Sequence, residues 1–172
     1  MAQDNTLVNR VAQSGIITLD LADFFPKEEI VEFDISPFLF QGIVLKEKDF
    51  RAYLDNHNYT PFSGKLVAVY CSTDALIPMW AYMLVAAKLV NIAHNIYFGN
   101  KQQTEQNYLL EQINLIDPAL YNNVRVVVKG CGDRIIPEAA FLAISKKLLP
   151  SVKSLMYGEP CSMVPVYKKP KV

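Results

Sequence analysis

The amino-acid sequence predicts an α/β fold: a three-layer α/β/α sandwich with a mostly parallel sheet, built from an internal β-α-β-α repeat. The chain repeats itself at an offset of 59 positions, which carries Asp74 onto Asp133 without a gap. Each copy holds an apolar run, then a proline that opens a helical stretch, then a strand that a glycine ends. A period of this size is typical of one repeated supersecondary unit. The matched residues are Val67, Val69, Asp74, Ile77, Pro78, Ala81, Lys88, Leu89 and Gly99, which fall on Val126, Val128, Asp133, Ile136, Pro137, Ala140, Lys147, Leu148 and Gly158.

The first 37 residues are predicted to supply N-terminal edge strands. Residues 16–21 and 30–35 alternate between apolar and polar side chains around the break FFPKEE. Alternation of this kind is typical of half-buried strands. We therefore expect an N-terminal antiparallel hairpin or edge pair.

The repeat is predicted to occupy residues 38–96 and 97–158, and it should begin near Phe38 and again near Tyr97. Residues 66–70 and 124–128 are apolar and do not alternate, as is typical of strands covered on both faces. Helices are expected to follow Pro78 and Pro137, because proline suits the first helical turn. The central strands of both copies should then lie in one parallel sheet.

The C-terminal residues 159–172 carry two internal prolines and a basic end, which predict an edge segment or a tail. With 172 residues, of which 51% are hydrophobic, the chain can bury one core. The sequence therefore predicts a single domain over residues 1–172.

Composition excludes several classes of partner. The formal net charge is zero, so no electric field draws a nucleic acid to the chain. No apolar run approaches the length of a membrane helix, and no signal peptide is recognisable. Three widely spaced cysteines match neither a disulfide framework nor a C-x-x-C motif. We expect a cytoplasmic protein with reduced thiols and without nucleic-acid or membrane partners.

The carboxyl edge of the sheet is the predicted site, because ligands of open parallel sheets bind there. His57 and His94 should lie at the opposite edge. Residues that the topology brings to the carboxyl edge fall into two groups. The candidate ligands for a metal or another group are Cys71, Cys131, Cys161, Asp74, Asp133 and Glu159, and the rim is expected to be lined by Ser72, Gly130, Gly132 and Trp80.

Each candidate also has a purely structural interpretation. Free cysteine is usually a small buried hydrophobe, and this is the favoured interpretation of Cys71. Asp74 and Asp133 occupy the same place in both copies, which favours a helix-capping role over a ligand role. Trp80 is expected to pack in the core rather than to stack on a ligand. For Cys131 and Cys161, packing and function stay open.

Motifs for phosphate binding, dinucleotide binding, serine hydrolysis and metalloproteolysis are missing from the sequence. The sequence therefore does not identify an enzyme. Three thiolates with a carboxylate suit zinc, iron or a transient iron–sulfur cluster.

Five segments together resemble, over nearly the whole chain, a bacterial family known as domain of unknown function 2480. They are NRVAQSGIITLDLADFFP, FDISPFLFQGIVLKEKDFRAYL, VAVYCSTDALIPMWAYMLVAAKL, VVVKGCGDRIIPEAAF and YGEPCSMVPVYKK. The resemblance brings no established activity. It implies proximity to genes of iron–sulfur cluster assembly, and hence assembly proteins as partners.

Two hypotheses follow. In the first, the chain is a cytosolic accessory of iron–sulfur cluster assembly, or of metal or sulfur handling, that works through its cysteines. In the second, it is a non-catalytic binding module or homodimeric scaffold that recognises a protein or a small anionic ligand. A homodimer is expected in either case.

Overall fold

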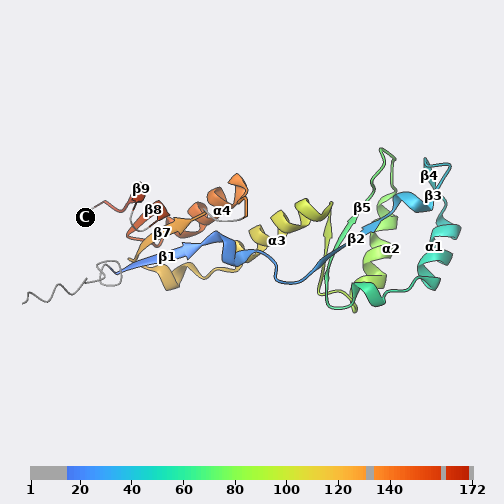
Figure 1. The fold of residues 1–172 in the computed structure, drawn as a ribbon, viewed down its shortest axis with the longest axis horizontal. Coiled ribbons are helices and arrows are strands. Elements are labelled where there is room, and N and C mark those ends of the chain that lie inside the picture. Colours follow the sequence, from blue (N-terminus) through green and yellow to red (C-terminus); the bar gives the residue numbers. More distant parts are fainter. Residues whose placement is uncertain (1–14, 131–133, 160–161, 171–172) are drawn as a thin grey trace, which may run out of the picture. The chain divides into compact units, whose positions relative to one another are not determined.

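The computed structural model describes residues 15–130, 134–159 and 162–170, and it has the predicted mixed α/β fold with mostly parallel strands. The chain divides into two compact units (Figure 1). Unit 1 comprises residues 1–25 and 109–172, and unit 2 comprises Pro26–Tyr108.

Unit 2 has a three-stranded parallel sheet with helices on both faces. Val67 and Val69 of the central strand pack against α1 and α2, whereas Leu66 and Ala68 lie in a separate cluster with Tyr108 of α3. Because both faces are covered, every side chain from Leu66 to Val69 is buried. The elements are β2 (Ile30–Asp34), β5 (Leu66–Tyr70) and β6 (Asn95–Phe98) of the sheet, the antiparallel pair β3 (Leu39–Phe40) and β4 (Val44–Leu45), and helices α1 (Glu47–Asn56), α2 (Met79–Leu89) and the start of α3 (Lys101–Leu115).

Unit 1 has a four-stranded sheet in the order β1-β7-β8-β9, with only β9 antiparallel. Its core gathers Ala140, Ile144 and Leu148 of α4 with Leu109 and Ile113 of α3, all fully buried against the sheet. The elements are β1 (Ile16–Asp20), β7 (Arg125–Lys129), α4 (Glu138–Leu148), β8 (Ser154–Glu159) and β9 (Ser162–Lys168). Short 3-10 turns occur in both units, namely η1 (Leu21–Phe24) and η4 (Pro118–Tyr121) in unit 1 and η2 (Ser36–Phe38) and η3 (Thr60–Phe62) in unit 2.

The internal repeat extends to backbone geometry. Helices α2 and α4 begin and end at equivalent positions, directly after Pro78 and Pro137. Gly99, which directly follows β6, has a φ angle of 119°, and Gly158, near the end of β8, has a φ angle of 118°. The positive φ of Gly64 also recurs, at Asn123, because both residues make the same tight connection.

The prediction of one parallel sheet for both copies is wrong. Strand β5 belongs to the sheet of unit 2 and β7 to the sheet of unit 1. The reason lies at the N-terminus, where β1 pairs in parallel with β7 and β2 pairs in parallel with β5 (Figure 1). Each copy therefore receives its own first strand and closes its own sheet.

The N-terminal strands are edge strands, as predicted, but they do not form a hairpin with each other. Near Phe38, where a repeat strand was expected to begin, only the two-residue β3 is found. The predicted C-terminal edge segment is confirmed, since β9 lies at the edge of its sheet. In the part of the chain that the structure describes, no helix is long and apolar enough to span a membrane.

Candidate functional site

The carboxyl edge of unit 2 carries a hydrogen-bonded cluster around Asp34, the last residue of β2. The backbone N–H groups of Ser36 and Ser72 donate to Asp34 Oδ1 at 2.9 and 3.0 Å. Their hydroxyl groups lie 2.7 and 2.6 Å from Asp34 Oδ2. Burial raises the pKa of Asp34, but the hydrogen bonds from Ser72 and Ser36 outweigh it, so this pKa lies below its usual value. The cluster ties the end of β2 to the loop after β5.

Asp20 occupies the equivalent place in unit 1. It is the last residue of β1, and its Oδ1 accepts the backbone N–H of Ala22 at 2.9 Å, just as Asp34 accepts that of Ser36. Asp20 caps the 3-10 turn η1, whereas Asp34 lies one residue before Ile35, the N-cap residue of η2. Sequence analysis missed both residues because they are related by an offset of 14 positions and not by 59.

The predicted capping role of Asp74 is wrong. Asp74 is exposed, and α2 begins at Pro78 without a side-chain cap. The N-cap residue of α2 is Pro78, four positions after Asp74, and no side-chain cap bond is formed there. Its counterpart Asp133 lies outside the described residues.

We expect Asp34→Ala to destabilise the protein by about 1 to 3 kcal/mol, because two backbone N–H groups lose their acceptor. Chemical denaturation of the variant measures this loss. Since the folded-state pKa of Asp34 is lowered, its contribution is present above the unfolded value near pH 3.8 and is lost as the pH falls through the folded value. Asp74→Ala is the matched control and should change stability by less than about 0.5 kcal/mol. Equal losses in both variants would contradict the assignment.

The carboxyl edge of unit 1 carries an ion-pair network. Lys129, the last residue of β7, lies between two carboxylates, with Nζ 3.3 Å from Asp20 Oδ2 and 3.4 Å from Glu159 Oε1. The hydrogen bond with Asp20 and the charge of Glu159 raise the pKa of Lys129. The candidate Glu159 therefore lies at the predicted edge, beside an amine.

Four of the sequence-predicted site residues cannot be placed. Cys131, Gly132, Asp133 and Cys161 lie outside the described residues. Gly130 is described, and a Cβ atom on it would come within 2.3 Å of the Phe141 ring. Glycine at this position thus serves the close approach of an aromatic side chain.

The other candidates lie in unit 2. Cys71 is half-buried, packs at the margin of the core, and its Sγ lies 3.3 Å from Thr73 Oγ1. Trp80 packs against the same core, 6.3 Å from the ring of Phe50, as expected. Because β5 and β7 belong to different sheets, the argument that gave Cys71 and Cys131 a common edge does not hold.

Histidine contributes to neither edge. His57 ends α1 and lies among aromatic rings, the nearest being Tyr53 and Tyr59, with centroids 4.9 and 5.0 Å away. Burial lowers the pKa of His57. Within residues 15–130, 134–159 and 162–170, no three His, Cys, Asp or Glu side chains gather in a way that could hold a metal ion.

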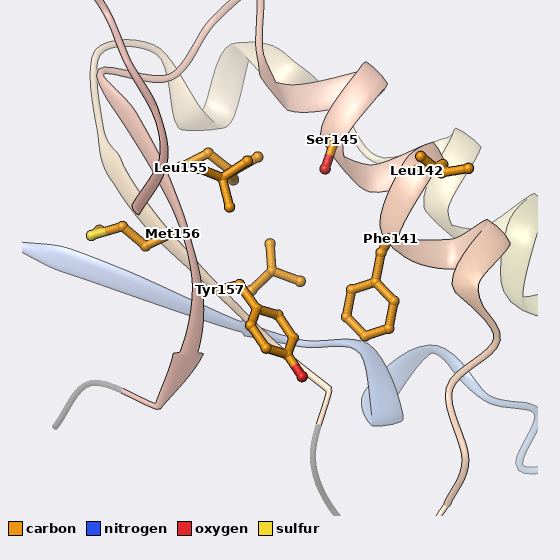
Figure 2. Close-up of a pocket in the computed structure, with 8 residues that line it drawn as sticks. Phe141, Leu142, Ser145, Leu155, Met156 and Tyr157 are labelled. Atoms are coloured by element: carbon orange, nitrogen blue, oxygen red, sulfur yellow. The ribbon is translucent and has the colours of Figure 1, made fainter. Parts of the chain in front are cut away.

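An apolar groove lies in unit 1, between α4 and the outer strands of the sheet (Figure 2). Its volume is about 380 Å³, within the usual range for ligand sites. Side chains from α4 and from strands β7, β8 and β9 line it. The lining residues are Val128, Phe141, Leu142, Ser145, Leu155, Met156, Tyr157 and Val166.

Two aromatic rings form one end of the groove. Phe141 and Tyr157 meet edge to face, with centroids 5.6 Å apart and planes at 77° (Figure 2). The equivalent pair in unit 2, Tyr82 and Phe98, has nearly the same geometry, 5.5 Å and 78°. The repeat could have revealed this pair, because both positions are aromatic in both copies. The hydroxyl of Ser145 adds one polar group that points into the groove (Figure 2).

The fold and the sites together define an α/β protein built from an internal repeat. Polar side chains bond the carboxyl ends of strands in both units, and unit 1 carries an apolar groove. The chain belongs to the family described as Protein of unknown function (DUF2480), whose model matches residues 5–169. This confirms the resemblance seen in the sequence. No curated protein and no solved structure matches the chain.

Proposed function

We propose that the protein is a non-catalytic binding module whose unit 1 groove takes apolar side chains of a partner protein. The groove itself carries this proposal. Its lining is apolar except for the hydroxyls of Ser145 and Tyr157, and it offers hydrogen bonds at few points. Apolar clefts with few polar groups are the usual form of binding sites.

A protein partner fits the groove better than a small molecule does. Among its lining residues, Leu142 and Val166 keep 75% and 56% of their surface exposed. A small ligand would leave these side chains in water, whereas a partner protein would cover them. Contiguous exposed apolar surface of this kind often marks a protein interface.

Strand β9 disfavours docking by strand addition. Pro165 lies in the middle of this edge strand, and Lys168 and Lys169 follow at its end. Proline and lysine are the residues that protect sheet edges from pairing with another chain. The partner therefore engages the groove with side chains and not with its main chain.

The test is a variant that fills the groove. Ser145→Leu places three carbon atoms where the hydroxyl points into the groove, and Ala86→Leu introduces leucine at the equivalent position of α2. With 1-anilinonaphthalene-8-sulfonate as the probe, the groove-filling variant should lose dye fluorescence, and the control should keep it. Peptides selected from a random library on the native protein should then bind the Ser145→Leu variant at least about tenfold more weakly. Equal binding to both variants would reject the groove as the site.

Metal or sulfur handling by Cys131 and Cys161 is the second candidate, and one observation favours it. Val128 pairs with Tyr157, and β7 and β8 end at Lys129 and Glu159, so these neighbouring parallel strands, about 4.8 Å apart, end at the same edge of the sheet. In the sequence, Cys131 follows Lys129 after one glycine, and Cys161 follows Glu159 after one proline. This spacing supports a pair of thiols that could hold zinc, iron or a transient iron–sulfur cluster together with assembly proteins. The odd number of cysteines also supports a cytoplasmic location.

Metal analysis of protein purified without a histidine tag tests this second candidate. Cys131→Ser and Cys161→Ser should each abolish bound zinc or iron, and Cys71→Ser should not. A native protein without metal, in which all three thiols react at the same rate, would count against it.

A further inference from the structure

We propose that a second copy of this chain docks on the outer face of α4, in an antiparallel contact about a two-fold axis. This face is defined by Glu138, Leu142 and Lys146, all exposed. Residues four apart lie above one another on a helix, so the three side chains form one line. The line runs opposite to the buried face of α4. This inference goes beyond the proposed function because it names a second copy of the chain as a partner, and it shares only Leu142 with the lining of the groove.

Charge complementarity identifies the occupant. Leu142 is at the centre of the line, with a carboxylate one turn before it and an amine one turn after it. An antiparallel copy that places Leu142 against its own equivalent brings Glu138 opposite Lys146 of the second copy. The same pairing occurs twice, because a two-fold contact is isologous. The face is therefore complementary to itself.

Shape supports the same occupant. On the flank of α4 that faces α3, a cavity of about 500 Å³ adjoins Leu142. Ala139 and Ala143 lie along this cavity, and their small side chains permit close approach of another helix. Leu110 of α3 forms its far wall. When Leu142 lies beside its equivalent at the two-fold axis, each of the two side chains also adjoins the cavity of the other copy.

The equivalent face of unit 2 lacks the pattern. Met79, Met83 and Ala87 stand where Glu138, Leu142 and Lys146 stand in α4. Met83 is as exposed as Leu142, at 71% against 75%, but no charges flank it. A single exposed apolar side chain is ordinary on a protein surface. The flanking charges therefore distinguish α4, and α2 supplies matched control positions.

Sedimentation velocity of the full chain over a concentration series tests the proposal. The native protein should form a reversible dimer. Leu142→Lys should weaken its dissociation constant by at least about tenfold, and Met83→Lys should leave it unchanged. Glu138→Lys should also weaken the dimer, because the introduced lysine meets Lys146 of the second copy. Lys146→Glu, added to Glu138→Lys, should restore the native constant to within about threefold, because it exchanges the two charges.

Several outcomes would overturn the proposal. They are a native protein that stays monomeric at all concentrations, a dimer that Leu142→Lys leaves intact, and a double variant no stronger than Glu138→Lys alone. Because all substituted side chains are exposed, circular dichroism should show native folding in each variant. Because Leu142 also lines the groove, Glu138→Lys is the variant that separates the two proposals, and loss of its dimers with retained peptide binding would leave the proposed function standing. Loss of peptide binding with retained dimers would contradict the proposed function and leave the dimer proposal standing.

Discussion

Phe50→Ala should destabilise unit 2 by about 3 to 5 kcal/mol, the usual cost of truncating a buried phenylalanine. Phe50 lies on α1 with 1% of its surface exposed. Its ring contacts Phe38 and Trp80, at centroid distances of 5.7 and 6.3 Å. Truncation therefore loses the buried area of the ring and leaves a cavity between two helices. Such a loss is large against the total stability of an ordinary domain.

The fluorescence of Trp80 measures this effect directly. Trp80 is the only tryptophan of the chain and belongs to unit 2, so its emission during urea denaturation reports that unit alone. Arg51→Ala is the control on the same helix. Arg51 is exposed and pairs only with Glu47, one turn away, so its removal should cost about 0.5 kcal/mol or less. A loss below about 1 kcal/mol for Phe50→Ala would contradict the described packing.

Gly158→Ala should destabilise unit 1 by about 2 kcal/mol or more. Gly158 has a φ of 118°, which side chains of L-amino acids rarely adopt. A Cβ atom there would also lie 2.5 Å from the backbone oxygen of Ser162. Because that oxygen belongs to the hairpin between β8 and β9, the clash can be relieved only by moving the backbone. Hydrogen exchange of the β8 and β9 amides should show the loss of protection.

Gly64→Asn is the control for this change. Gly64 also has a positive φ, 68°, but nothing lies within 4 Å of the position that a Cβ atom would take. At the equivalent place in unit 1, Asn123 already adopts a φ of 57°. Asparagine tolerates this left-handed conformation, so the cost should stay below about 1 kcal/mol. Similar losses for Gly158→Ala and Gly64→Asn would show that backbone conformation at Gly158 carries no special strain.

Local sequence patterns predicted the repeated part of the fold. Apolar runs, prolines and glycines are signals that act over a few residues, and they located β5, α2, β7 and α4. The residue offset of 59 also paired Phe50 with Leu109, and both side chains are buried against their own sheet. These features follow from local geometry and hydrophobic burial, which the sequence carries directly.

Sheet membership needed long-range pairing. The local sequence pattern of β1 (Ile16–Asp20) fits two pairings equally well, an antiparallel hairpin with β2 and the observed parallel pairing with β7. More than 100 residues separate β1 from β7, and only the closure of each unit selects that pairing. The same long-range step brought Asp20 to Lys129 and Asp34 to Ser72.

The sequence by itself determined the α/β class, the two copies, the buried positions of their helices and the candidate cysteine set. Tertiary structure alone decided that the copies form two sheets, with β5 in one and β7 in the other, and that β8 and β9 line an apolar groove beside α4. The physical reason is the range of the interactions. Periodicity specifies which face of an element is buried, whereas the partner of that face depends on chain segments far away in sequence.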